Sequence, residues 1–115
     1  MDISFSWTTE ALLAGKKTVT RRDWSTKHAN KFKVGTWHWA TNKQRRFGGK
    51  IIGRVYIVSI RREPLVKMLN DTKYGYIEIE KEGGLWKTPG EFVRLFGELR
   101  YGDPYRVEFT FFEFS

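Results

Sequence analysis

The chain has 115 residues, a formal net charge of +8 and no cysteine, and 17% of its residues are aromatic. This length predicts a single domain over residues 1–115 with a modest core, and the missing cysteine excludes thiol nucleophiles, zinc–thiolate sites and disulfide frameworks. The missing cysteine also fits a reducing cytoplasm, where we expect the protein to be. Because no apolar run has the length of a signal-peptide core or approaches the ~20 residues of a membrane span, we expect a soluble protein that contacts no membrane.

The positive charge is concentrated in the amino-terminal half of the chain. Residues 1–62 carry 14 Lys and Arg against three acids, whereas residues 63–115 carry seven against ten. Such an asymmetry predicts a surface for a polyanion, and we expect RNA or a nucleoside as the partner. A solvated basic surface without a partner is the alternative. The sequence gives no indication of the oligomeric state.

The first predicted element is a short helix over residues 8–14. Thr8 or Thr9 can cap its start, and Gly15 can end it in a left-handed conformation. The next residues, 17–22, are rich in Thr and basic side chains and favour a β-strand.

A polar, irregular segment is expected over residues 23–33. Residues 34–40 are predicted to form a strand, because Trp37 and Trp39 alternate with a histidine. Both tryptophans are core candidates in so short a chain. Residues 42–49, which are charged and contain two adjacent glycines, favour a hairpin.

The clearest strand covers residues 50–61. It is apolar on both faces after Val55, which is typical of a central strand. A proline can open a short helix over residues 64–69. Residues 70–87 show no readable period, and Trp86 within them is another core candidate.

The strongest helix signal covers residues 89–99. Residues 88–91 have the pattern of a capping box with proline at the first helical position. An apolar stripe follows at helical spacing, formed by Phe92, Leu95, Phe96 and Leu99. After a turn, residues 105–114 alternate as a strand, and the break in phase at Phe111 and Phe112 predicts a bulge.

These elements predict an α+β fold with about five to six strands and two or three short flanking helices. Closing the sheet into a small barrel would remove its exposed edges. The alternative is an open sheet, over which the pattern alone favours a barrel only slightly.

One short motif carries more information than the pattern. Residues 15–22 read Gly-Lys-Lys-Thr-Val-Thr-Arg-Arg and resemble the G-x-K-x-x-T-x-R signature of ASCH domains, with the signature positions filled by Gly15, Lys17, Thr20 and Arg22. The resemblance extends to an acidic loop at residues 82–84 and to Gly-Asp-Pro before the last strand. It implies a PUA-like β-barrel with a cleft beside the first helix.

The resemblance also implies two kinds of function. Many ASCH domains are regarded as RNA-binding modules, and some small bacterial members resemble amidohydrolases that remove the acyl group from N4-acetylcytidine. Their lysine, threonine and glutamate fall by position on Lys17, Thr20 and Glu82. Glu80 is the alternative to Glu82, because the loop length varies.

The residue types suit amide hydrolysis on chemical grounds. A threonine hydroxyl can attack, a lysine made less basic by burial can accept its proton, and a glutamate can protonate the leaving amine or position water. In an ideal strand Lys17 and Thr20 point to opposite faces. They converge only if Lys17 lies in the turn after Gly15 or if a bulge intervenes. A chance Lys-x-x-Thr is the alternative.

Other basic and aromatic residues are candidate contacts to RNA or to a base, namely Arg21, Arg22, Trp24, Arg45 and Arg46. Trp24 can equally be a hydrophobic plug over the barrel. The basic stretch that contains Arg45 and Arg46 can equally be a solvated loop.

Among whole functions, binding of RNA or a nucleobase in a basic cleft ranks ahead of N4-acylcytidine hydrolysis. A metal-independent ribonuclease ranks third, because the usual catalytic histidine pair is not evident. His28 and His38 have no acidic ligands nearby, and no Walker pattern exists, so we expect neither a metal nor a cofactor.

Overall fold

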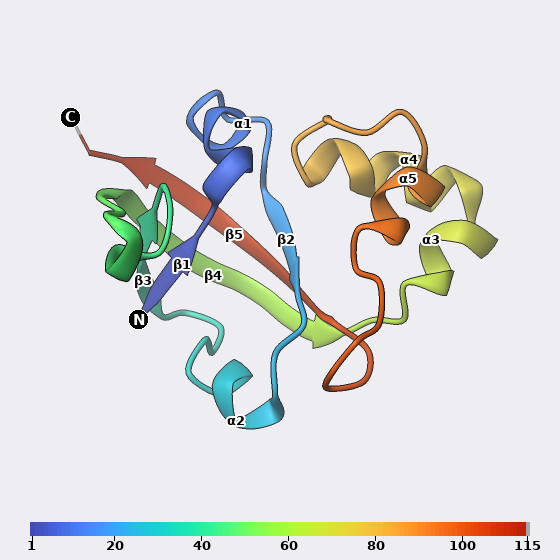
Figure 1. Cartoon of the computed structure of the whole chain (residues 1–115), viewed down its shortest axis with the longest axis horizontal. Coiled ribbons are helices and arrows are strands. Elements are labelled where there is room, and N and C mark those ends of the chain that lie inside the picture. Colours follow the sequence, from blue (N-terminus) through green and yellow to red (C-terminus); the bar gives the residue numbers. More distant parts are fainter. Residues whose placement is uncertain (115) are drawn as a thin grey trace.

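The computed structural model of the chain describes residues 1–114, which form a five-stranded sheet, five α-helices and two short 3-10 helices (Figure 1). The strands are β1 (Asp2–Ser4), β2 (Val19–Arg22), β3 (Trp37–Thr41), β4 (Ile51–Arg62) and β5 (Tyr105–Glu113). Their order in the sheet is β1-β3-β4-β5-β2. The β1–β3 pair is parallel and the other pairs are antiparallel.

The sheet is curled into a half-barrel, with β1 and β2 as its two edges. A side chain joins these edges, because Arg22 of β2 donates a hydrogen bond to the carbonyl oxygen of Ser4 in β1 over 2.6 Å. The predicted α+β fold with a barrel-like sheet is therefore confirmed.

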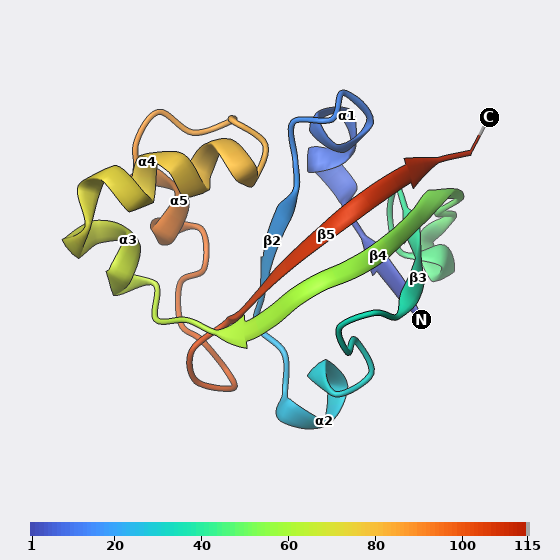
Figure 2. The same ribbon diagram turned by 180° about the vertical axis from the view of Figure 1, so that it is seen from behind.

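The helices are more numerous than the two or three predicted. They are α1 (Thr9–Leu13), α2 (Thr26–Ala29), α3 (Val66–Asn70), α4 (Thr72–Lys81) and α5 (Pro89–Arg94), and the 3-10 helices are η1 (Ser6–Thr8) and η2 (Arg45–Phe47). Helices α3, α4 and α5 gather at one end of the sheet (Figure 2). No helix among residues 1–114 is long and apolar enough to cross a membrane.

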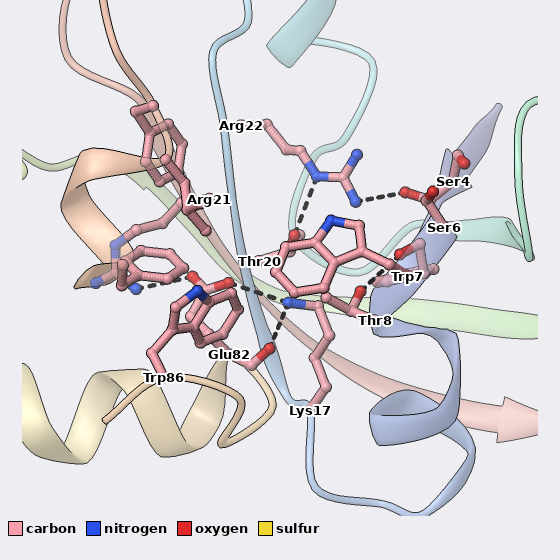
Figure 3. A pocket seen from close by; sticks show the side chains of 14 residues that line it. Ser4, Ser6, Trp7, Thr8, Lys17, Thr20, Arg21, Arg22, Glu82 and Trp86 are labelled. Carbon is pink, nitrogen blue, oxygen red and sulfur yellow. Dashed lines mark hydrogen bonds and ion pairs between the residues drawn. The ribbon is translucent and has the colours of Figure 1, made fainter. Parts of the chain in front are cut away.

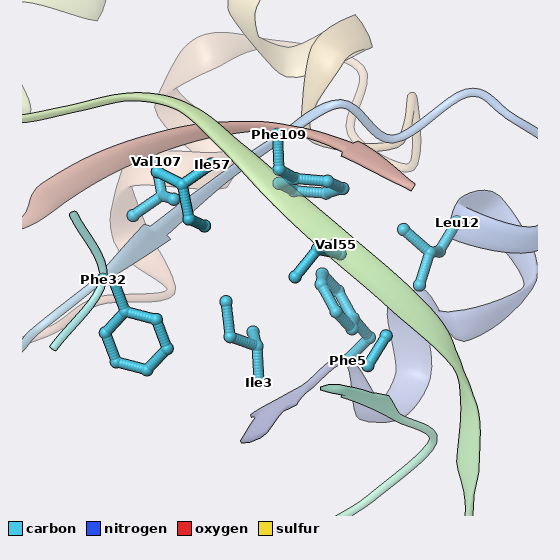
Figure 4. Close-up of a cluster of buried hydrophobic side chains, with 9 residues drawn as sticks. Ile3, Phe5, Leu12, Phe32, Val55, Ile57, Val107 and Phe109 are labelled. Carbon is cyan, nitrogen blue, oxygen red and sulfur yellow. The ribbon is translucent and has the colours of Figure 1, made fainter. Parts of the chain in front are cut away.

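The main core lies inside the curl of the sheet (Figure 4). Its buried members come from β1, β3, β4, β5 and α1, from the junction between β1 and η1, and from the loop between α2 and β3. They are Ile3, Phe5, Leu12, Phe32, Ala40, Val55, Ile57, Val107 and Phe109. A smaller cluster of Met68, Ile79 and Phe92 holds α3, α4 and α5 together. The chain thus has a barrel part and a helical part.

Helix α4 occupies most of the segment that showed no period. Its buried face contains Gly75, Glu78 and Ile79, so the usual apolar stripe is interrupted by a glycine and a carboxylate. Asp71 caps it by accepting a hydrogen bond from the backbone of Tyr74. The segment predicted to be irregular over residues 23–33 likewise contains a helix, α2, which Ser25 caps.

Two helix predictions need correction. The helix predicted over residues 89–99 ends at Arg94, although Thr88 caps it as expected. Leu95 is exposed rather than part of an apolar face, because the chain leaves the helix there. Thr8 does not cap α1 through its side chain, which instead donates to the carbonyl oxygen of Phe5.

Three strand predictions also need correction. The register shift lies in β4 between Ile57 and Ser59, not at Phe111 and Phe112, so the extra residue belongs to the longer strand. β4 is central in the sheet, but Val58 on its second face is exposed. Trp37 and Trp39 are not core residues: 46% and 39% of their surfaces are exposed, because they point away from the barrel interior.

Candidate functional site

A cavity of about 280 Å³ lies where β2, η1 and the loops flanking α5 meet (Figure 3). Lys17, Thr20, Arg22 and Glu82 all line it. The motif residues and the glutamate of the acidic loop therefore lie around one cavity.

The convergence follows from the geometry of the turn after α1. Gly15 has a φ of +76°, which reverses the chain at the end of the helix. Lys17 therefore lies before β2 begins, and its side chain is free of the strand alternation that would separate it from Thr20. The backbone N–H of Thr18 then donates to the carbonyl oxygen of Lys81 over 2.8 Å, which ties the motif to the end of α4.

The acidic loop is held close to α1 by a glycine. A Cβ atom on Gly83 would meet the Cβ atom of Ala11 at 3.0 Å, and the residue has a φ of +132°. Glu82, directly before it, is buried and faces the pocket, whereas Glu80 is exposed and lies outside this pocket's lining. The loop position left open by the sequence is thus occupied by Glu82.

The ammonium group of Lys17 is fully surrounded by acceptors. Its Nζ atom donates to the carbonyl oxygens of Val19 and Glu82 over 3.0 and 2.8 Å, and to Oε1 of Glu82 over 3.0 Å. Burial lowers the pKa of Lys17 below its usual 10.5, while the ion pair with Glu82 acts in the opposite direction. The neutral amine is therefore easier to reach than in an exposed lysine.

Arg21 does not present a free guanidinium to solvent. Its side chain is 1% exposed and forms ion pairs with Glu82, Glu78 and Glu63 over 2.9, 2.6 and 2.8 Å. Arg106 of β5 contacts Glu78 from the other side. Within residues 1–114, these ion pairs form one network of three buried cations and three buried carboxylates: Lys17, Arg21, Arg106, Glu63, Glu78 and Glu82. Because the charges are equal in number, the network brings no net charge to the pocket.

The network predicts a decline in stability in acid. Burial opposes ionisation of Glu78, but hydrogen bonds from Arg106 and Arg21 outweigh it and lower the pKa of Glu78 from 4.5 to about 2. A lowered carboxyl pKa stabilises the fold above the unfolded value, and this stability is lost as the pH falls through the folded value. We expect the free energy of unfolding to drop between pH 4.5 and pH 2, by on the order of 3 kcal/mol for this group.

Thermal unfolding followed by tryptophan fluorescence at stepped pH measures this decline. The variant Glu78→Gln, which cannot titrate there, should depend less on pH in the same window. A melting temperature of the wild-type chain that stays level down to pH 2 would contradict the prediction.

Thr20 and Arg22 of β2 line the pocket with polar groups. The hydroxyl oxygen of Thr20 accepts a hydrogen bond from Nε of Arg22 over 3.0 Å, so its proton can be donated to a ligand. Arg22 uses two of its five N–H groups within residues 1–114, on Thr20 and on Ser4. Over the same residues no hydrogen bond joins Lys17 to Thr20.

Two tryptophans line the pocket, and the sequence analysis placed neither of them there. Trp7 is 62% exposed and its ring lies edge-on to Trp86 at 5.4 Å between centroids. Trp86 is half-buried: it packs on Phe92 of the smaller cluster at 4.7 Å between ring centroids, which agrees with its prediction as a core candidate, and it also lines the pocket. Ser6, beside them, has a φ of +46°, which is rare for a residue with a side chain. The sequence carried no periodic signal for this irregular turn.

The remaining candidates lie at a neighbouring hollow of about 400 Å³, which Arg22, Trp24, Arg45 and Arg46 help to line. Arg45 is ion-paired with Asp2 over 2.7 Å. Trp24 stacks on Phe32 at 4.5 Å between centroids and packs against the core, which is the plug arrangement. Arg22 and Ser4 line both the pocket and the hollow, so the two adjoin at the hydrogen bond between these residues.

No group of three or more His, Asp or Glu residues among residues 1–114 is arranged to hold a metal ion. The buried carboxylates near the pocket are instead occupied by Arg and Lys.

Comparisons with known proteins establish the fold. No family model and no curated protein matches the sequence. The structure is similar to the crystal structure of a mutant of ZmASCH from Zymomonas mobilis, with a TM-score of 0.57 and 19% sequence identity. The similarity covers 97% of this chain and 66% of that protein, so the chain spans about two thirds of its length. The chain therefore has the fold of an ASCH protein, as the motif implied.

Proposed function

We propose that the chain binds RNA and that the pocket beside β2 receives a single nucleobase or nucleoside. The observation that carries this proposal is that the pocket combines two tryptophan rings with hydrogen-bond donors that have no acceptor among residues 1–114. Trp7 and Trp86 offer ring faces and edges to a flat ligand, while Arg22 and Thr20 offer N–H and O–H groups to its carbonyl oxygens.

The size and charge of the pocket support a base rather than a larger ligand. Pockets for drug-sized molecules typically measure roughly 300–1,000 Å³, and this cavity of about 280 Å³ lies just below that range. The buried ion network is neutral overall, so the positive charge at the opening comes from Arg22. A neutral ring with a nearby anionic phosphate matches that distribution.

The neighbouring hollow offers a path for the rest of an RNA strand. It adjoins the pocket at Arg22 and extends to Arg45 and Arg46, which lie in η2 on the basic half of the chain. Arg46 has its guanidinium over the ring of Phe47 at 4.9 Å, in an exposed position. Phosphates along this edge would meet cations, as electrostatic RNA binding requires.

Two pocket variants test the proposal by calorimetry with cytidine, uridine and short single-stranded RNA. Thr20→Val should weaken nucleoside binding roughly 3- to 10-fold, because it removes one hydrogen bond without changing the shape. Trp7→Leu should weaken it roughly 5-fold or more, because stacking is lost. Tyr76→Leu is the matched control, because Tyr76 is an exposed aromatic on α4 that lines neither the pocket nor the hollow. Wild-type affinity in both pocket variants would refute the proposed site.

A second candidate function is hydrolysis of N4-acylated cytidine in the same pocket. The observation that favours it is the lowered pKa of Lys17 beside a threonine whose hydroxyl proton is uncommitted. In this reaction Oγ1 of Thr20 would attack the acyl carbon while the neutral amine of Lys17 accepts the hydroxyl proton.

The rest of that reaction follows from the contacts of Glu82. Its carboxylate lies between Lys17 and Arg21, an arrangement that suits accepting a hydrogen bond and orienting the lysine. The ammonium of Lys17 would return its proton to N4 as the C–N bond breaks and cytidine leaves. Water would then cleave the acyl–threonine ester and release the carboxylic acid.

A further inference from the structure

We propose a second RNA-binding surface, the aromatic face formed by Trp37, Trp39, Arg54, Tyr56, Phe112 and Phe114 on the outside of β3, β4 and the end of β5. This aromatic face has no residue in common with the pocket or the hollow that carry the proposed function. Its occupant is inferred to be single-stranded RNA, whose bases stack on the rings.

The strand register places these residues side by side on one face. Trp39 lies opposite Arg54, which lies opposite Phe112, and Trp37 lies opposite Tyr56. The rings touch their neighbours, with centroids 5.1 Å apart for Trp37 and Tyr56 and 5.4 Å for Trp37 and Phe112. The guanidinium of Arg54 sits 4.7 Å from the Trp37 ring centre. The result is a continuous aromatic surface across three strands.

The helices leave this half of the sheet uncovered. Helix α4 covers the other half, where Arg21 and Arg106 on the outer side of β2 and β5 reach Glu78. Figure 1 shows α3, α4 and α5 together at that end, away from β3 and the end of β5. Phe112 and Phe114 accordingly expose 47% and 46% of their surfaces.

A sheet face turned to water normally carries polar side chains. Cross-strand aromatic pairs do stabilise a sheet, but by only about 0.2–1 kcal/mol each, and smaller β-formers would expose less apolar area. A contiguous exposed patch of large rings is instead typical of an interaction surface.

The charges on the aromatic face favour a polyanion over a second copy of the chain. Among the outward positions of this half within residues 1–114, which are 37, 39, 54, 56, 110, 112 and 114, Arg54 is the only charged residue. A twofold dimer through this face would bring the two copies of Arg54 near each other without an acid to separate them. Bases on rings with a phosphate at Arg54 satisfy both the apolar area and the charge.

The test uses fluorescence anisotropy with a labelled oligouridine of about 12 nucleotides, a length within the usual range of single-strand sites of roughly 4–16. Trp37→Leu and Phe112→Leu keep an apolar side chain but remove the ring, and each should weaken binding roughly 5-fold or more. Arg54→Gln should flatten the plot of log affinity against log salt by about 0.7, the loss of one phosphate contact. Tyr76→Leu should bind as the wild-type chain does.

Nucleoside binding separates this surface from the pocket. Cytidine and uridine should bind Trp37→Leu and Phe112→Leu with wild-type affinity, because neither residue lines the pocket. Unchanged oligouridine affinity in both variants would overturn the inference, whether or not the pocket variants lose nucleoside binding. A wild-type dimer that becomes a monomer in Trp37→Leu, with unchanged oligouridine affinity, would assign the aromatic face to a second copy and overturn it too.

Discussion

Glu78→Ala should lower the free energy of unfolding by about 3–5 kcal/mol, the usual cost of removing one partner from a buried ion pair. The side chain of Glu78 is 1% exposed and pairs with both Arg21 and Arg106. Its removal would leave two buried guanidinium groups without that carboxylate. Since domains of this size are stable by only about 5–15 kcal/mol, the loss should be visible as a large shift of the urea midpoint.

Glu108→Ala is the matched control for this effect. Glu108 also pairs with Arg106, over 3.3 Å, but its side chain is 39% exposed. An exposed pair contributes about 0–1 kcal/mol, so the control should unfold almost as the wild-type chain does. Equal urea midpoints for Glu78→Ala and Glu108→Ala would contradict the prediction, because the buried carboxylate would then contribute no more stability than the exposed one.

The motif predicted the members of the pocket but not the network behind it. Spacing alone put Lys17 and Thr20 on opposite faces, and the condition for their convergence, a turn after Gly15, is met. The partners of Arg21 come from residues 42, 57 and 61 positions away in the chain. Charged residues usually lie on the surface, so neither Arg21 nor Glu78 could be recognised as buried before their partners were known.

The same limit explains the missed helix and the misplaced tryptophans. Period-based reasoning finds a helix by its apolar stripe, and α4 buries Glu78 where a stripe residue would be. For β3, alternation correctly predicted a strand through Trp37 and Trp39. It did not say which side of the sheet would be covered, because that depends on where α3, α4 and α5 pack.

Under the proposed hydrolysis of N4-acylated cytidine, Lys17→Arg should abolish release of acetate from N4-acetylcytidine while leaving nucleoside binding largely intact. A guanidinium keeps the positive charge beside Glu82 but does not deprotonate, so it cannot act as the base. General-base catalysis contributes about 10²–10⁴-fold, and we expect a loss of at least about 100-fold in kcat/KM. Lys16→Arg, the exposed neighbour in the motif, should turn over as the wild-type chain does.

The pH dependence of the proposed hydrolysis tests the role of Lys17 independently. Because burial lowers its pKa below 10.5, the neutral amine forms at lower pH than for a free lysine, and kcat/KM should rise with pH and level off before 10.5. Circular dichroism of Lys17→Arg checks that the larger side chain is accommodated next to Val19 and Glu82. If the wild-type chain binds nucleosides but releases no acetate, the hydrolysis proposal is wrong and the pocket only binds its ligand. Turnover by Lys17→Arg at the wild-type rate would show that Lys17 is not the base, because an arginine side chain stays protonated and cannot accept the proton of Thr20.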